Sequence, residues 1–300
     1  MIIVIDALNR ERSKGMLDEM FRLRARVFGD RLGWEVNIQD GMEIDKFDAL
    51  DPAYVIGLDD QGHVISCVRA LQTTGPHMLA DVFSAILDGE PTLRSATLWE
   101  STRFCVDTQR LGSGRGRNSV SYATCELMVG SLEFAKQSGI TDIVTVIDPI
   151  MDRVLKRSNN APYDYLGSTK PMGKVSALAA LLDCSQERID RVRSFADIQG
   201  DIFLEEHAAL ELFECSRGAA QSDNVVTLHP RLGVSQRPAV KATSDELLHY
   251  FMDQIRSANS EKDRKAAVAL AGVVVEAMVQ SRPDGERTTR VPHPTLGTVN

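Results

Sequence analysis

Apolar positions in residues 1–215 follow two spacings, one typical of strands and one typical of helices. A stripe of apolar residues three or four positions apart predicts a helix over 11–29, formed by Met16, Met20, Leu23 and Val27. Further helices are predicted over 78–87, 118–138, 149–157 and 185–195. Strands are predicted over 2–5, 53–58, 63–71, 97–106 and 142–147, with another apolar run at 175–182. Because strands and helices alternate, the sequence predicts a layered α/β domain over 1–215.

The composition changes after residue 215. Residues 216–241 are rich in Ser, Gln, Asn, Gly and Pro, which predicts a linker. Residues 242–282 carry two helical patterns and predict a helical hairpin extension, and 283–300 is predicted to be a disordered tail. Two helices alone bury little surface. We therefore expect the hairpin to dock on another surface, and an oligomer contact through 242–282 is one such use.

Composition and charge limit the functions open to the chain. Hydrophobic residues make up 43% and charged residues 25%, an ordinary balance for a globular protein. The net charge of −8 lacks the basic field on which non-specific nucleic-acid binding relies, so we predict no nucleic-acid partner. Five scattered cysteines without a C-x-x-C pair and six histidines without H-x3-H spacing predict reduced thiols and no metal site. We expect no membrane contact and a cytoplasmic location, since no secretory leader pattern or bilayer-length apolar run is recognisable.

The most specific pattern lies between residues 23 and 48. R-x3-F-x2-R-x2-W begins at Arg24, and E-x-D-x-F-D covers 43–48. Each of these residues alone is most often an ordinary surface or core residue. In this order they resemble the N-terminal signature of the LuxI-type acyl-homoserine-lactone synthases.

Downstream residues agree with this resemblance. Arg69 lies in a predicted strand, the stretch 73–83 is similar to the family, and Trp99 begins W-E-S-T-R-F, which resembles the family's E-x-x-R strand. The resemblance covers about residues 1–215 and implies a three-layer α/β/α sandwich related to the GNAT acyltransferases. The C-terminal helical extension is a departure from the family.

The resemblance implies a quorum-sensing signal synthase. Such an enzyme transfers an acyl group from acyl-carrier protein or acyl-CoA to the amine of S-adenosylmethionine, and then closes the lactone and releases methylthioadenosine. S-adenosylmethionine is a substrate here, and no cofactor is implied. Acids and aromatic faces suit its sulfonium cation, and arginines suit its carboxylate. The residues expected to bind it are Arg24, Phe28, Trp34, Asp45, Asp48, Arg69 and Arg103.

Acyl transfer to an amine also needs a base and donors for the oxyanion. Glu100 is the candidate base, with Ser101 as a helper and Arg103 beside them, and we expect Glu100 to join a coupled cluster of acids and arginines. In a regular strand, however, residues 100 and 103 point to opposite faces. We therefore predict a β-bulge or a splay near 101–103, which would also free backbone N–H groups for the thioester carbonyl.

Residues expected to contact the acyl chain are Met78, Phe83, Leu98, Trp99, Val144, Thr145 and Val146. Thr145 falls where the family places a small polar residue that reads the third carbon of the chain. A threonine is compatible with an oxo or a hydroxyl group there, so the sequence determines neither the length nor the oxidation state of the chain.

Two further features concern the acyl donor. The loop Gln109–Gly114 matches Q-x-x-G-x-G before a helix, a pattern that suits phosphate, the phosphopantetheine arm or a plain turn. Arg153, Lys156 and Arg157 form a basic helix face that suits an acidic carrier protein. A GNAT-like acyltransferase with acyl-CoA and another amine is the alternative enzyme, and a binding or regulatory module is the alternative outside catalysis.

Overall fold

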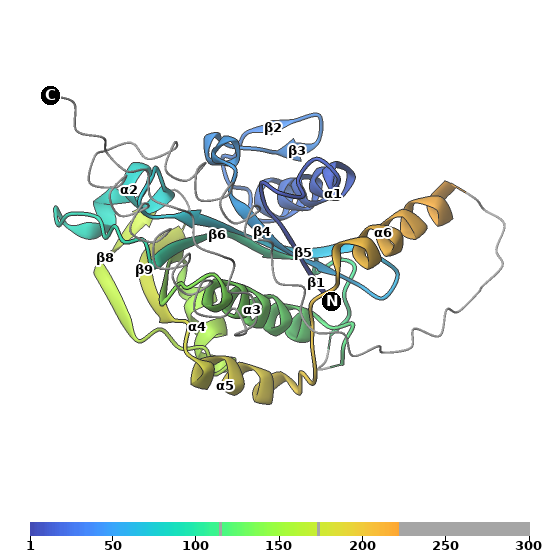
Figure 1. Ribbon diagram of the computed structural model, residues 1–300. Helices are drawn as coiled ribbons and strands as arrows, with labels where there is room; N and C mark the ends of the chain where they lie inside the picture. The colour runs from blue at the N-terminus through green and yellow to red at the C-terminus, as the bar shows by residue number, and fades with distance from the viewer. Residues whose placement is uncertain (114–115, 173–174, 222–300) are drawn as a thin grey trace, which may run out of the picture.

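The computed structural model describes residues 1–113, 116–172 and 175–221. Its centre is a seven-stranded sheet with the order β1-β4-β5-β6-β7-β9-β8 (Figure 1). The strands are β1 (Ile2–Ile5), β4 (Ala53–Leu58), β5 (Val64–Gln72), β6 (Leu98–Val106), β7 (Asp142–Ile147), β8 (Asp164–Met172) and β9 (Val175–Asp183). Neighbouring strands are antiparallel except β6 and β7, which run parallel. A separate hairpin pairs β2 (Ile38–Gln39) with β3 (Met42–Glu43).

Helices cover both faces of the sheet, which confirms the predicted α/β/α sandwich with a GNAT-like fold. On one face, here called the α3 face, lie α3 (Val120–Gln137), α4 (Pro149–Arg157) and α5 (Gln186–Ala196) (Figure 1). On the opposite face, the α1 face, lie α1 (Lys14–Arg24) and α2 (Met78–Asp81). Apolar side chains alternate between the faces along each strand. In β4, for example, Val55 packs with α3 and Tyr54 packs with α1.

The helix predicted over 11–29 is shorter and has two parts. The α-helix α1 ends at Arg24, and a π-helical segment, η1 (Ala25–Arg31), follows it. The glycine at position 29 lets the β2 hairpin approach, because a Cβ there would lie 2.5 Å from Ile38 Cδ1. The apolar spacing indicates a helix but does not distinguish an α turn from a wider π turn, and π segments are frequent at functional sites.

The predicted helix over 78–87 is also interrupted. It consists of α2 and the 3₁₀ turn η3 (Ser84–Leu87), and another 3₁₀ turn, η2 (Lys46–Leu50), lies in the acidic segment. Strand β8 has no counterpart in the sequence analysis. It is an edge strand whose side chains alternate between exposed and half-buried, so it carries few apolar residues to mark it.

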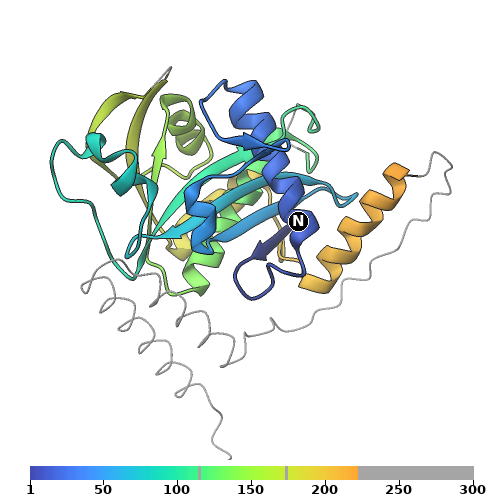
Figure 2. The same cartoon turned by 90° about the horizontal axis from the view of Figure 1, so that it is seen from above.

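The last described element, α6 (Glu206–Gln221), crosses residue 215, where the sequence analysis ended the domain. Figures 1 and 2 place α6 at the β1 edge of the sheet, and Ala209 and Phe213 are buried with residues of α1. The predicted linker over 216–241 is therefore helical up to Gln221. Its remainder, the hairpin over 242–282 and the tail over 283–300 lie outside the described residues.

Strand β6 contains the predicted irregularity. Arg69 pairs with Thr102 but Cys67 pairs with Cys105, so β6 has one residue more than β5 in this interval. Arg103 lies in the bulge with φ of +55°. Strands β6 and β7 pair only from Leu98 to Ser101 and separate beyond that point. Both the bulge and the splay are confirmed. None of the described helices combines the length and the apolar character needed to cross a bilayer.

Candidate active site

Three arginines and three acids form a closed ring of alternating charge on the α1 face, here called the ion-pair ring. In order, its members are Arg24, Glu43, Arg103, Asp45, Arg69 and Asp48. Arg24 donates two parallel bonds to Asp48, at 2.8 and 2.9 Å, and a third to Glu43 at 2.5 Å. Each arginine thus bridges two acids, an arrangement that fits the forked guanidinium.

The other two arginines close the ring. Arg69 binds both oxygens of Asp45, at 2.6 and 3.0 Å, and reaches Asp48 at 2.7 Å. Arg103 binds Glu43 at 2.9 Å and Asp45 at 2.7 Å. The bulge is what makes this possible, because it turns the Arg103 side chain to the same face as Arg69.

The spacing of the two aspartates has a local cause. Asp45 is the N-cap of η2 and accepts a bond from the Phe47 amide at 2.8 Å. In turn, the Asp48 carboxylate accepts a hydrogen bond from the Asp45 backbone amide, also at 2.8 Å. This capping box orients both carboxylates through local hydrogen bonds, in addition to their bonds with the arginines. Phe47 is buried, and the Arg69 guanidinium lies over its ring at 5.6 Å.

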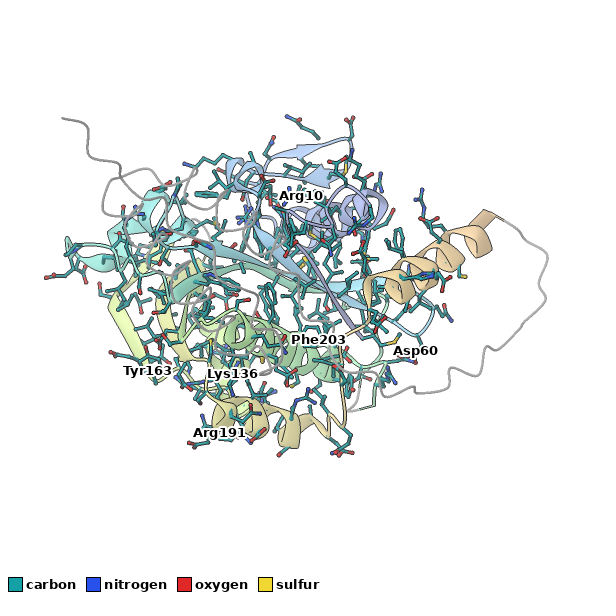
Figure 3. The ribbon with its side chains drawn as sticks, in the orientation of Figure 1. Arg10, Asp60, Lys136, Tyr163, Arg191 and Phe203 are labelled. Carbon is teal, nitrogen blue, oxygen red and sulfur yellow. The ribbon has the colours of Figure 1, made fainter. Side chains whose placement is uncertain are left out.

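A second layer supports Asp48 from behind. The Tyr54 hydroxyl donates to Asp48 at 2.6 Å. Arg10, which Figure 3 shows on the α1 side of the sheet, donates to the carbonyl oxygens of Asp48 and Pro52. Its guanidinium lies over the Tyr54 ring at 5.4 Å. Burial by itself would raise the pKa of Asp48, but the Arg24 hydrogen bond and the Arg69 charge outweigh burial and hold it well below its usual range. Asp48 is therefore ionised at neutral pH.

The ring has a closed side and an open side. The side chains of Arg24, Glu43 and Arg69 are completely buried, whereas Arg103 is 11% exposed and Asp45 is 15% exposed. Arg24, predicted to contact the substrate, thus lies at the back of the ring. A ligand that approaches the ring meets Arg103 and Asp45 first.

The two predicted aromatic residues lie beside this open side. Phe28 and Trp34 are stacked with ring centroids 5.1 Å apart, and the Arg103 guanidinium lies 5.5 Å from the Phe28 centroid. Phe28 is buried and Trp34 is 37% exposed. The charged and aromatic residues predicted to bind the substrate therefore lie together in the structure. They come from α1, η1, η2, β5, β6 and the segments next to these elements.

Glu100 lies next to the ring but outside it, unlike our expectation. Its two carboxylate oxygens accept the backbone N–H groups of Met78 and Leu79, both at 2.6 Å. The sulfur of Met78 in turn accepts from Arg69 at 3.3 Å and from Arg103 at 3.6 Å. Burial raises the pKa of Glu100 to about 7, against the lowering effect of the two amides. Such a pKa suits a group that exchanges protons near neutral pH.

Ser101, predicted as a helper, points away from Glu100. Strand alternation directs Ser101 to the α3 face, where it lines a small pocket with Ser131 and Phe134. The hydroxyl on the Glu100 face belongs to Thr102, which accepts from Arg69 Nε at 3.0 Å. Thr102 was missed by the sequence analysis, although the period of two along the strand could have indicated it.

The residues predicted for the acyl chain are divided between the two faces. The α1-face group packs in the core around α2 and η3: Met78, Phe83, Leu98, Val144 and Val146. Trp99 and Thr145 lie on the α3 face. The Thr145 hydroxyl donates to the Ser101 carbonyl at 3.0 Å, at the last paired position of β6 and β7. One chain on one face can contact only one of these groups.

The loop before α3 is already engaged by a carboxylate. Asp107 accepts the backbone N–H groups of Gln109 and Arg110, at 3.0 and 3.1 Å. These two amides are thus used internally, and residues 114–115 lie outside the description. On α4, Arg153 and Arg157 are exposed, and Lys156 pairs with Asp152 at 2.7 Å.

Comparison with known proteins agrees with this geometry. The model of the autoinducer synthase family matches residues 8–192. A probable acyl-homoserine-lactone synthase of Sinorhizobium fredii is 38% identical over 178 residues, which are 59% of this chain and 85% of the relative.

Two solved structures show the same fold. The acyl-homoserine-lactone synthase LasI is 30% identical with a TM-score of 0.57, over 65% of this chain and 94% of its own. MesI, described as a CoA-dependent acyl-homoserine lactone synthase, is 26% identical with a TM-score of 0.59, over 68% of this chain and 100% of its own. The chain belongs to the autoinducer synthase family, and its activity is that of an acyl-homoserine-lactone synthase, an acyltransferase.

Proposed function

We propose that the open side of the ion-pair ring binds S-adenosylmethionine. The observation that carries this proposal is the exposure of Asp45 and Arg103 beside the stacked pair of Phe28 and Trp34. The Asp45 carboxylate and the aromatic faces suit the sulfonium cation, and the Arg103 guanidinium suits the substrate carboxylate. Arg24, Asp48 and Arg69 position these two side chains.

The two substrates meet from opposite faces of the sheet. The ring and the Glu100 carboxylate lie on the α1 face, and the small pocket lined by Trp99 and Ser101 lies on the α3 face. The splay between β6 and β7 beyond Ser101 lies between them. In this proposal the acyl chain occupies the α3 face and the amine of S-adenosylmethionine reaches the thioester through the splay.

Glu100 takes the proton from the amine, directly or through water. The amine nitrogen then bonds to the thioester carbonyl carbon, and the C–S bond of the thioester breaks to release the thiol. Backbone N–H groups of β6 beyond Ser101, where β7 no longer pairs, donate to the oxyanion. In the second step the substrate carboxylate attacks the carbon next to the sulfonium, which closes the lactone and expels methylthioadenosine.

The proposed acyl donor is a carrier-protein thioester that docks on α4. Arg153 and Arg157 are exposed on this helix next to Ile150, whose side chain is 63% exposed. Exposed arginines around an apolar residue suit the acidic surface of a carrier protein. A CoA thioester is the other donor to test, because the similar protein MesI is described as CoA-dependent. A cytoplasmic location stays a prediction from the sequence.

The direct test incubates the purified protein with S-adenosylmethionine and either a carrier-protein or a CoA thioester. Mass spectrometry should detect an acyl-homoserine lactone and methylthioadenosine in equal amounts. Methylthioadenosine without lactone, or an acylated amine from a different acceptor, would contradict the proposed reaction.

A further inference from the structure

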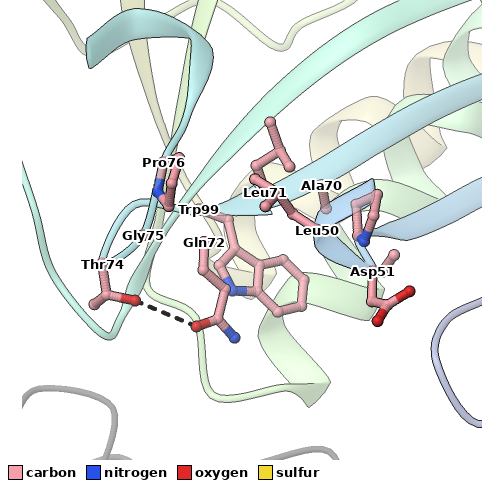
Figure 4. A pocket seen from close by; sticks show the side chains of 11 residues that line it. Leu50, Asp51, Ala70, Leu71, Gln72, Thr74, Gly75, Pro76 and Trp99 are labelled. Carbon is pink, nitrogen blue, oxygen red and sulfur yellow. Dashed lines mark hydrogen bonds between the residues drawn. The ribbon is translucent and has the colours of Figure 1, made fainter. Parts of the chain in front are cut away.

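Trp99 lies between two pockets on the α3 face. The smaller pocket is lined by Ser101, Ser131 and Phe134. The larger pocket is open to solvent between residues 50–53 and 72–76 (Figure 4). Trp99 and Ala70 line both pockets. The indole therefore forms a wall that the two pockets share.

Within the part of the chain that the structure describes, packing rather than a hydrogen bond holds the indole in place. The indole Nε1 is buried and has no hydrogen-bond partner among the residues that the structure describes. In Figure 4 the nitrogen lies on the side of the ring that faces Gln72. The ring itself packs against Phe134, with centroids 5.4 Å apart at 45°. A buried donor without an acceptor is rare in native proteins and calls for a reason.

Of the two pockets, the smaller one adjoins the splay between β6 and β7, where we place acyl transfer. It is lined by Glu100 and Ser101 at the end of the paired part of β6 and β7, beside the splay, while the Glu100 carboxylate itself lies on the α1 face. Because Trp99 lines both pockets, an acyl chain that occupied the smaller pocket would have to pass the indole to reach the larger one. The length available to the chain therefore depends on the size of one side chain.

We propose that Trp99 is the end wall of the acyl site and sets the longest chain that the enzyme accepts, with the larger pocket as the space that a smaller residue would open. This proposal rests on the proposed acyl-homoserine-lactone synthesis. It makes Trp99 a specificity-determining residue, and it predicts that the empty space beyond the ring is usable by substrate.

The test measures kcat/KM of the full chain with S-adenosylmethionine and thioesters from butanoyl to tetradecanoyl. Trp99→Leu should move the preferred chain to a longer one and change the ratio of long-chain to short-chain kcat/KM by about tenfold or more. Trp99→Phe, which is easier to accommodate, should give a smaller shift in the same direction. Thermal unfolding of each variant shows whether it is folded.

A second substitution makes the test specific. Ala53 lines only the larger pocket, so Ala53→Met should leave the wild-type profile unchanged and cancel the long-chain gain of Trp99→Leu. Phe195→Leu, in the same core but away from both pockets, is the matched control and should not move the profile. Folded Trp99 variants with the wild-type profile would overturn this inference. A wild-type protein that makes no lactone from any thioester would instead overturn the proposed function.

Discussion

Asp48 receives two parallel hydrogen bonds from Arg24, at 2.8 and 2.9 Å, and neither side chain is more than 3% exposed. Removing one partner of such a pair leaves a buried charge without compensation. This relationship makes the ring a requirement for folding as well as for binding.

Arg24→Lys should therefore destabilise the protein by about 3–5 kcal/mol, because an ammonium group cannot bridge Asp48 and Glu43 as the fork does. Arg22→Lys, on the same helix and 41% exposed, should change stability by about 0.5 kcal/mol or less. Chemical denaturation of both variants checks this, and equal stabilities would mean that the ring does not support the fold.

Asp45→Asn tests binding with a smaller loss of stability than Arg24→Lys. Asparagine keeps the capping acceptor for the Phe47 amide and a hydrogen-bond acceptor for Arg69, but it removes the charge that Arg69 and Arg103 share. The unfolding temperature should therefore fall, by less than in Arg24→Lys because Asp45 is partly exposed. The charge that faces the proposed sulfonium is lost, and KM for S-adenosylmethionine should rise about tenfold or more. Asp30→Asn, an exposed acid on η1, is the control. An unchanged KM would remove Asp45 from the substrate site.

The raised pKa of Glu100 leads us to expect that activity depends on pH. Because burial raises its pKa to about 7, the basic form grows as pH rises through 7, and kcat/KM should rise with it. Glu100→Gln should lower kcat by a factor of about 100 or more and abolish this rise. Glu90→Gln, an exposed acid, should keep the wild-type profile. A variant at Glu100 with the wild-type pH profile would show that another group is the base.

The same group predicts a pH dependence of stability. The pKa of Glu100 is about 7 in the folded protein and 4.5 in its ordinary state, so the folded protein binds more protons between these values. The contribution of Glu100 to the free energy of unfolding should therefore fall as pH rises from about 4.5 to about 7. The difference in unfolding free energy between wild type and Glu100→Gln should show this slope, and a difference independent of pH would contradict it.

A chain that ends at Gln221 should keep both the fold and the activity, because the described core contacts lie within it. A chain that ends at Glu205 lacks α6 and the buried Phe213, and should unfold at a lower temperature. Phe213→Ala in the full chain should cost about 3–5 kcal/mol. Loss of activity in the longer truncation would show that residues after 221 contribute to catalysis.

Arg153→Glu combined with Arg157→Glu tests the proposed carrier-protein surface. The KM for a carrier-protein thioester should rise severalfold or more, while the KM for the matching CoA thioester should stay unchanged. Arg191→Glu, on α5, is the control, since this side chain is exposed on a different helix. An equal effect on both donors would place the two arginines outside a protein interface.

Some of the site follows from local sequence alone. Asp45 and Asp48 are three positions apart because one caps the turn and the other closes the capping box, and both interactions lie within four residues. The alternation of side chains along β6 required an irregularity between Glu100 and Arg103, and the strand contains it. Periodic apolar residues likewise indicated most strands and helices, because one buried face imposes that period.

Other parts were decided by the tertiary structure. Arg103 meets Glu43 across 60 positions, and Glu100 meets the amides of Met78 and Leu79 across about twenty, so no local pattern marks either partner. The burial of Arg24, and the separation of Ser101 from Thr102 by the sheet, likewise depend on which surface packs on which. A sequence lists the charges and their local spacing. Only the folded chain determines which of these charged groups are exposed to water and which carboxylate each arginine or backbone amide binds.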